Sequence, residues 1–151
     1  MYEPIRAKSV HTMAEPQFPH RSREEELDIQ LAGHLAALLA VTDELRNLSS
    51  GGSHGGARPA QDLDSAASRI ADEVARLRRE PRPRRPGAPS ATPPHDGARV
   101  IDLHRQAHTL AGRALVVAAS RADTTAAILA AERMDAHAAA LAEPAGATGS
   151  P

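Results

Sequence analysis

Cysteine and tryptophan are absent from the 151-residue chain, which has one tyrosine and one phenylalanine. Without cysteine the chain forms no disulfide and offers no thiolate as a nucleophile or as a ligand for zinc or an iron–sulfur cluster. With two aromatic residues in all, it has few of the side chains on which single-stranded nucleic acids stack their bases. The absences therefore exclude thiol chemistry and argue against recognition of single strands by stacking.

Large apolar residues are also scarce, because Leu, Ile, Val and Phe fill 26 of the 151 positions. That share lies below the roughly 20 per cent associated with disorder, but disorder of this kind also requires a high net charge. The deficit is filled by 32 alanines, the best helix former, while 18 basic and 19 acidic residues leave a net charge of -1. The composition predicts one small all-α domain with a thin core.

No segment has the pattern of a signal peptide or a membrane span. Residues 1–23 contain Pro4, Pro16 and Pro19 without apolar periodicity, and we expect them to be a disordered arm. The apolar run Leu35–Val41 is far shorter than the roughly 20 residues that cross a bilayer. A cytoplasmic protein without membrane contact is expected, with a second disordered segment at 144–151.

The strongest helical pattern predicts a helix over about 24–48. Ser22 is a plausible N-cap, and the three glutamates that follow complement the helix dipole. The apolar stripe has the spacing of a coiled coil and is Leu27, Leu31, His34, Leu38, Val41, Leu45 and Leu48. A helix with so long a stripe is expected to bind a second copy of the chain or another helical protein. The expected interface is Leu31, His34, Leu38, Val41 and Leu45.

His34 has two interpretations in that stripe. As a polar group in the seam it would fix the register of helix pairing at some cost in stability. Alternatively, a second stripe through Leu35 and Leu39 rotates the helix and leaves His34 partly exposed. The sequence leaves both open.

Three further helices are expected at about 62–79, 99–121 and 124–142, with linkers at 49–61 and 80–98. The first linker is rich in Gly and Ser, and the second is rich in Pro and Arg. Asp123 is the expected N-cap of the last helix, and the short turn before it predicts an antiparallel helical hairpin. The predicted fold is a loose three- or four-helix bundle that forms one domain over 24–143.

The second linker concentrates positive charge in a nearly neutral chain. The arginines that would contact phosphates are Arg78, Arg79, Arg82, Arg84 and Arg85. The other interpretation is a solvated, semi-rigid spacer, because proline favours extended backbone. Auxiliary nucleic-acid binding is therefore the alternative function.

His104 and His108 are spaced so that one helical face could present both imidazoles to a metal, with Asp102 or His137 as a third ligand. Arg105 between them disfavours a bound cation, and structural or exposed histidines are the alternative. No spacing of Ser, His and Asp resembles a catalytic site, and we expect neither a cofactor nor enzymatic activity.

The segment Gly112–Leu141, with the Ala122–Asp123 turn and Ala127, resembles one hairpin of a tetratricopeptide repeat. It lacks the large aromatic positions of that family and has no second copy at a 34-residue period. The composition, with one Lys and 17 Arg, is similar to that of small all-helical proteins of high-GC actinobacteria. Taken together, the sequence predicts a non-enzymatic protein–protein interaction or regulatory module.

Overall fold

The computed structural model describes residues 21–50, 57–87 and 96–143. The described residues form four helices, and their bounds are α2 (Arg23–Ser50), α3 (Ala57–Arg78), α4 (Gly97–Arg121) and α5 (Thr124–Ala142). Within these ranges no strand occurs. The prediction of an all-α bundle is confirmed.

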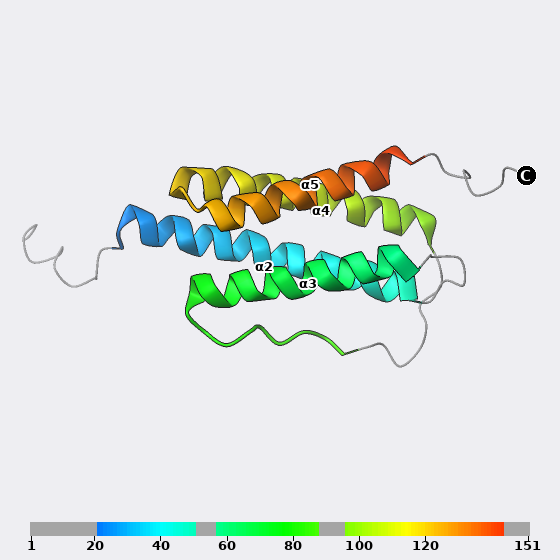
Figure 1. The fold of residues 1–151 in the computed structure, drawn as a ribbon, viewed down its shortest axis with the longest axis horizontal. Coiled ribbons are helices and arrows are strands. Elements are labelled where there is room, and N and C mark those ends of the chain that lie inside the picture. Colours follow the sequence, from blue (N-terminus) through cyan, green and yellow to red (C-terminus); the bar gives the residue numbers. More distant parts are fainter. Residues whose placement is uncertain (1–20, 51–56, 88–95, 144–151) are drawn as a thin grey trace, which may run out of the picture.

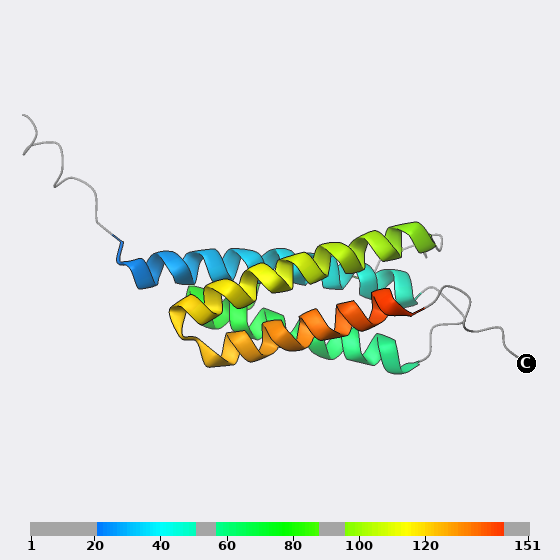
Figure 2. The same ribbon diagram turned by 90° about the horizontal axis from the view of Figure 1, so that it is seen from above.

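Two antiparallel hairpins stack on each other (Figure 1). One hairpin consists of α2 and α3, and the other consists of α4 and α5. The two hairpins are joined mainly by the packing of α4 against α2. The contact between α3 and α5 is the sparsest of the four. Seen from above, α3 and α4 run in the same direction (Figure 2), so the chain must return along the bundle between them.

Leucine and alanine build the core. Leu31, Leu35, Leu38 and Leu45 of α2 are at most 1% exposed. The opposite hairpin contributes mainly small side chains, which let the axes of α4 and α5 approach closely. These buried alanines are Ala107, Ala111, Ala114, Ala118, Ala126 and Ala130. The chain has few large apolar residues, and the large side chains of its core come mainly from the leucines of α2.

Side chains that accept hydrogen bonds from backbone amides fix three helix starts. The Ser22 hydroxyl accepts from the Glu25 amide at 3.1 Å, and the Glu25 carboxylate accepts from the Ser22 amide at 3.3 Å, which is a capping box. Asp96 accepts from the first-turn amides of α4. Asp123 accepts from the Ala126 amide at 3.1 Å. The predicted caps at Ser22 and Asp123 and the predicted α4–α5 hairpin are confirmed.

The start of α3 differs from the prediction. The helix begins at Ala57 rather than near residue 62, and Pro59 lies inside its first turn. Proline is tolerated there because the first amides of a helix have no intrahelical acceptor. The first linker is correspondingly shorter than 49–61. The predicted disorder of residues 1–20 and 144–151 lies outside the described residues.

Among the four described helices, none is both long enough and apolar enough to span a membrane.

Candidate functional site

The apolar stripe of α2, which was predicted to bind another chain, is buried inside the bundle. Leu31 and Leu38 are fully buried, and Val41 and Leu45 are 6% and 1% exposed. Helix α2 packs against both α3 and α4, so the second stripe through Leu35 and Leu39 is buried as well. The expectation that these four residues bind another chain is corrected, because they have no free surface in the folded protein.

His34 is the member of that set that stays accessible. Its side chain is half-buried at the edge of α2. It lines a hollow of about 420 Å³ together with residues of α4 that include Gly112, Arg113 and Val116. The interpretation of His34 as a partly exposed residue is confirmed.

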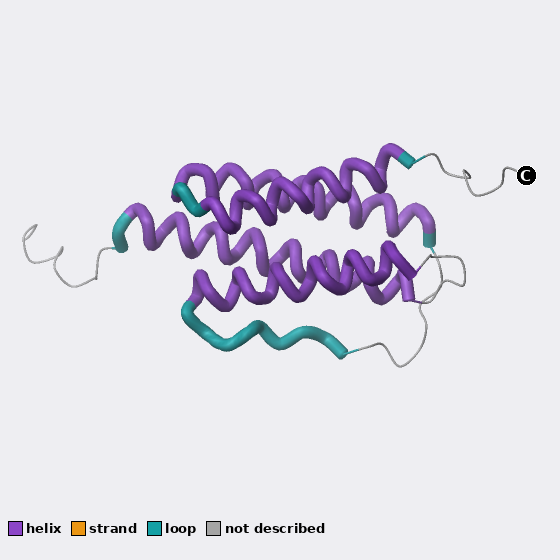
Figure 3. The backbone as a smooth tube through the Cα atoms, viewed as in Figure 1, coloured by secondary structure: helices purple, strands orange, loops and turns teal. Residues whose placement is uncertain are grey.

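The arginine- and proline-rich segment lies against the bundle. After α3, residues 79–87, here called the strap, run back toward the end where α3 begins (Figures 1 and 3). Arg82 Nε donates to Asp72 Oδ1 of α3 at 2.6 Å, and Arg82 also contacts Ser68. The strap is largely exposed, as predicted for a solvated linker, but its arginine contacts tie it to the bundle, so it is not a free spacer.

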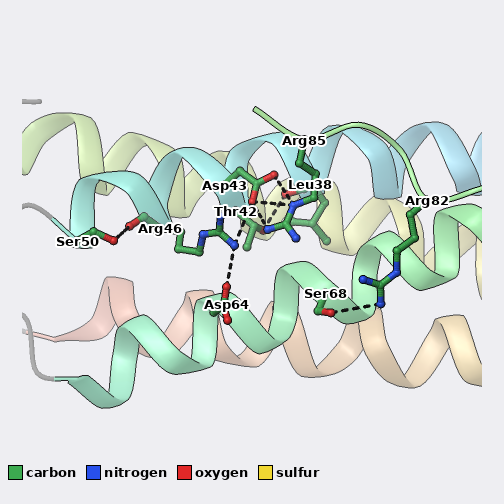
Figure 4. A network of polar contacts seen from close by, with 9 residues as sticks. All are labelled: Leu38, Thr42, Asp43, Arg46, Ser50, Asp64, Ser68, Arg82 and Arg85. Carbon is green, nitrogen blue, oxygen red and sulfur yellow. Dashed lines mark hydrogen bonds and ion pairs between the residues drawn. The ribbon is translucent and has the colours of Figure 1, made fainter. Parts of the chain in front are cut away.

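The second anchor of the strap is Arg85, whose guanidinium binds Asp43 of α2 (Figure 4). Arg85 Nε lies 3.0 Å from Asp43 Oδ2, and the Asp43 side chain is 4% exposed. Hydrogen bonding to Asp43 raises the pKa of Arg85 above its ordinary value, although burial works against it. Two of the five arginines predicted to contact phosphates, Arg82 and Arg85, are thus engaged within the chain. Arg78, Arg79 and Arg84 are exposed.

The histidines are arranged differently from the chelate that their spacing in the sequence allows. His104 of α4 contacts His137 of α5, with their Nδ1 atoms 3.0 Å apart and their ring planes tilted by 50°. Since this contact needs one protonated and one bare Nδ1 atom, the two neutral rings adopt different tautomers. No group of three potential metal ligands among His, Cys, Asp and Glu occurs in the described ranges. His104 makes this contact with α5, and His108 is half-buried outside it.

Arg133 makes the surroundings of this pair electropositive. Burial, followed by the charges of Arg133, His104 and His108, lowers the pKa of His137 to about 3. Burial and Arg133 also lower the pKa of His104, which Glu143 opposes. Arg133 is 5% exposed and contacts Asp62 at 3.4 Å. His137 is therefore neutral at pH 7, and the pKa of His104 is shifted in the same direction.

Three branched apolar side chains are exposed on the α4–α5 hairpin. Ile101 and Val116 of α4 are 42% and 66% exposed, and Ile128 of α5 is 53% exposed. A hollow of about 290 Å³ lies between α4 and α5, and six of its eight lining residues are alanine or isoleucine. The lining residues are Ala118, Ala119, Ala122, Asp123, Thr124, Ala127, Ile128 and Ala131. Val116 instead lines the hollow beside His34, which shares no lining residue with this one. We call Ile128 and the hollow floored by alanine the interaction face.

Sequence reasoning missed the interaction face although a signal exists. Ile128 directly follows Ala127, a residue of the apolar pattern of the last helix. A large apolar residue outside such a pattern is a candidate for an exposed contact. Leu129 also lies outside the pattern, yet it is 2% exposed, so the tertiary fold decides which of the two residues is exposed.

No protein-family model matches the chain, and no curated protein or solved structure matches it either. The function has to be argued from the geometry of the chain itself.

Proposed function

We propose that this chain is a non-enzymatic protein–protein interaction module that receives an amphipathic helix of another protein on its interaction face. The observation that carries the proposal is the 53% exposure of Ile128 at a hollow floored by alanine. Burial of this side chain by a partner would contribute about 1.5–3 kcal/mol. A large apolar anchor seated in a groove is typical of helix-in-groove complexes.

The shape of the face favours a helix as the occupant. The hollow follows the line between two antiparallel helices, and the alanine side chains of its floor are short. A third helix laid along this line can bring its backbone close to both neighbours, as in helix bundles. The proposed contact surface lies on the outer side of α4 and α5, whereas the sequence predicted it on α2.

The test compares two isoleucines of nearly equal exposure. Ile128 is 53% exposed on the interaction face, and Ile29 of α2 is 50% exposed outside it. The full-length protein, Ile128→Asp and Ile29→Asp would be used to capture proteins from the cells that express it, with a high-salt wash. We expect the wild type and Ile29→Asp to retain the same protein and Ile128→Asp to lose it.

Two outcomes would contradict the proposal. Equal retention by Ile128→Asp and the wild type would show that the face is not used. The second outcome would come from light scattering after gel filtration. A wild-type dimer that Ile128→Asp dissociates and Ile29→Asp preserves would show that the face binds a second copy of the chain and not a helix of another protein.

A further inference from the structure

The strap is seated on an acidic surface of the α2–α3 hairpin. Arg82 Nε donates to Asp72 Oδ1 at 2.6 Å, and Arg82 Nη2 donates to Ser68 Oγ at 3.4 Å. Arg85 Nε donates to Asp43 Oδ2 at 3.0 Å. We call this surface the strap site and define it by the residues Asp43, Asp64, Ser68 and Asp72.

The charge of the strap site matches the charge that the strap brings to it. Its three aspartates form ion pairs with one helix arginine among the described residues, Arg46, which lies 2.7 Å from Asp64 and 3.8 Å from Asp43 (Figure 4). Two negative charges therefore remain on the hairpin. The two arginines of the strap that contact the site neutralise both.

The strap is attached by these side chains rather than by its backbone. Residues 81–87 form no backbone–backbone hydrogen bond with any residue that the structure describes, and none of them belongs to the buried core. Pro81, Pro83 and Pro86 have no amide hydrogen to donate. A segment attached in this way is released at a lower free energy than a helix of the core.

Asp43 lies deeper than a surface tether requires, since its side chain is 4% exposed. Replacing a buried ion pair by apolar residues is often neutral for stability, whereas removing one partner is costly. An aspartate at this depth therefore distinguishes arginine from other side chains. Arg46 stays beside Asp43 when Arg85 leaves, so the carboxylate keeps a cation while one peptide replaces another.

We propose that the strap is an intramolecular ligand, and that the strap site binds an extended, arginine- and proline-rich peptide of another protein in its place. The strap itself defines the chemistry of that peptide. Its two contacting arginines, Arg82 and Arg85, are three positions apart, and Pro81, Pro83 and Pro86 favour an extended backbone before it binds.

The docked strap inhibits this binding. An incoming peptide competes with a tethered segment that has a high effective concentration, so its apparent affinity is lowered by the fraction of molecules in which the strap is docked. The strap site lies on α2 and α3, whereas the interaction face lies on α4 and α5. The two surfaces can therefore be tested separately.

The test uses synthetic peptides that copy residues 79–87. The first peptide keeps Arg82 and Arg85 and has alanine in place of Arg79 and Arg84. The control peptide has the two pairs exchanged, so both peptides have the same net charge. Each is titrated into the full-length wild type and into the full-length variant Arg82→Ala/Arg85→Ala, whose strap has lost both contacts.

The first peptide should bind the double variant at least about tenfold more tightly than it binds the wild type, because the tethered competitor is gone. It should also bind the double variant about tenfold more tightly than the control peptide does. Equal binding of the two peptides, or binding of neither, would overturn the proposal. Equal binding of the first peptide by the wild type and the double variant would overturn it too.

A second measurement does not depend on the folding of the double variant. The chain has no cysteine, so Gly33→Cys/Gly87→Cys supplies two unique positions for spin labels. A Cβ atom at either glycine would meet no other part of the protein within 4 Å. An excess of the first peptide should displace the strap and broaden the distribution of distances between the labels, and the control peptide should not. A distribution that neither peptide changes would contradict the proposal.

Discussion

Arg85 of the strap binds Asp43 of α2 across 42 positions of sequence, with Arg85 Nε donating to Asp43 Oδ2 at 3.0 Å. The Asp43 side chain is 4% exposed and that of Arg85 is 24% exposed. A carboxylate at that depth needs a cation, since an unpaired buried charge is far more costly than a solvated one. The pair therefore makes the strap part of the folded bundle.

Arg85→Ala is expected to lower the free energy of unfolding by about 2 kcal/mol, because Asp43 would be left buried without its main partner. Urea denaturation at pH 7 measures the loss. Arg84→Ala is the matched control, since Arg84 is exposed in the same strap. An equal effect of the two substitutions would mean that the strap contributes no specific contact.

The His104–His137 pair predicts that acid destabilises the fold well above the pKa of carboxylates. The folded pKa of His137 is about 3, against about 6.5 for an unfolded histidine. Between these values the unfolded chain binds more protons, so stability is complete above pH 6.5 and is lost as the pH falls. The loss between pH 6.5 and 5 should reach about 2 kcal/mol.

Urea denaturation across that pH range checks the prediction. His137→Leu should flatten the dependence, and His108→Gln, which changes a half-buried histidine of α4 outside the 3.0 Å contact, should retain it. A wild-type stability that is constant from pH 6.5 to 5 would show that the pair is not neutral in the folded state.

Leu38→Ala is expected to destabilise the monomer by about 3 kcal/mol, because Leu38 is fully buried in the core. Ile29→Ala, on the same helix but half exposed, should change the free energy of unfolding by less than about 0.5 kcal/mol. Thermal unfolding at several protein concentrations is the measurement. A melting temperature that rises with protein concentration would show instead that Leu38 lies in an interface between chains.

The sequence was sufficient for the features that depend on neighbouring residues. The helix periods, the caps at Ser22 and Asp123 and the α4–α5 hairpin all follow from residues within a few positions of one another. The spacing also placed Ala114 in the core, where it is fully buried. On α5 it selected Ala127 and Ala131, whereas the fully buried alanines are Ala126 and Ala130, one position earlier.

Features that depend on distant residues were not predictable in the same way. The stripe of α2 has the spacing of a coiled coil. The residues near Leu38 in the sequence, however, do not determine whether α3 and α4 or another chain covers it. Likewise, arginine beside proline has the composition of a solvated linker, and the partners Asp43 and Asp72 that hold Arg85 and Arg82 lie on helices folded elsewhere. Composition describes a segment, whereas pairing depends on the tertiary fold.

The course of the strap also determines how the bundle assembles. Each hairpin is made of contacts between consecutive helices, and such contacts form quickly because the loops that they close are short. The contact of α2 with α4 joins the two hairpins, and the strap keeps them at a high effective concentration while they dock. If the chain is cleaved between α3 and α4, docking becomes a bimolecular step. The stability of the nicked protein would then depend on its concentration, as in a dimer of hairpins.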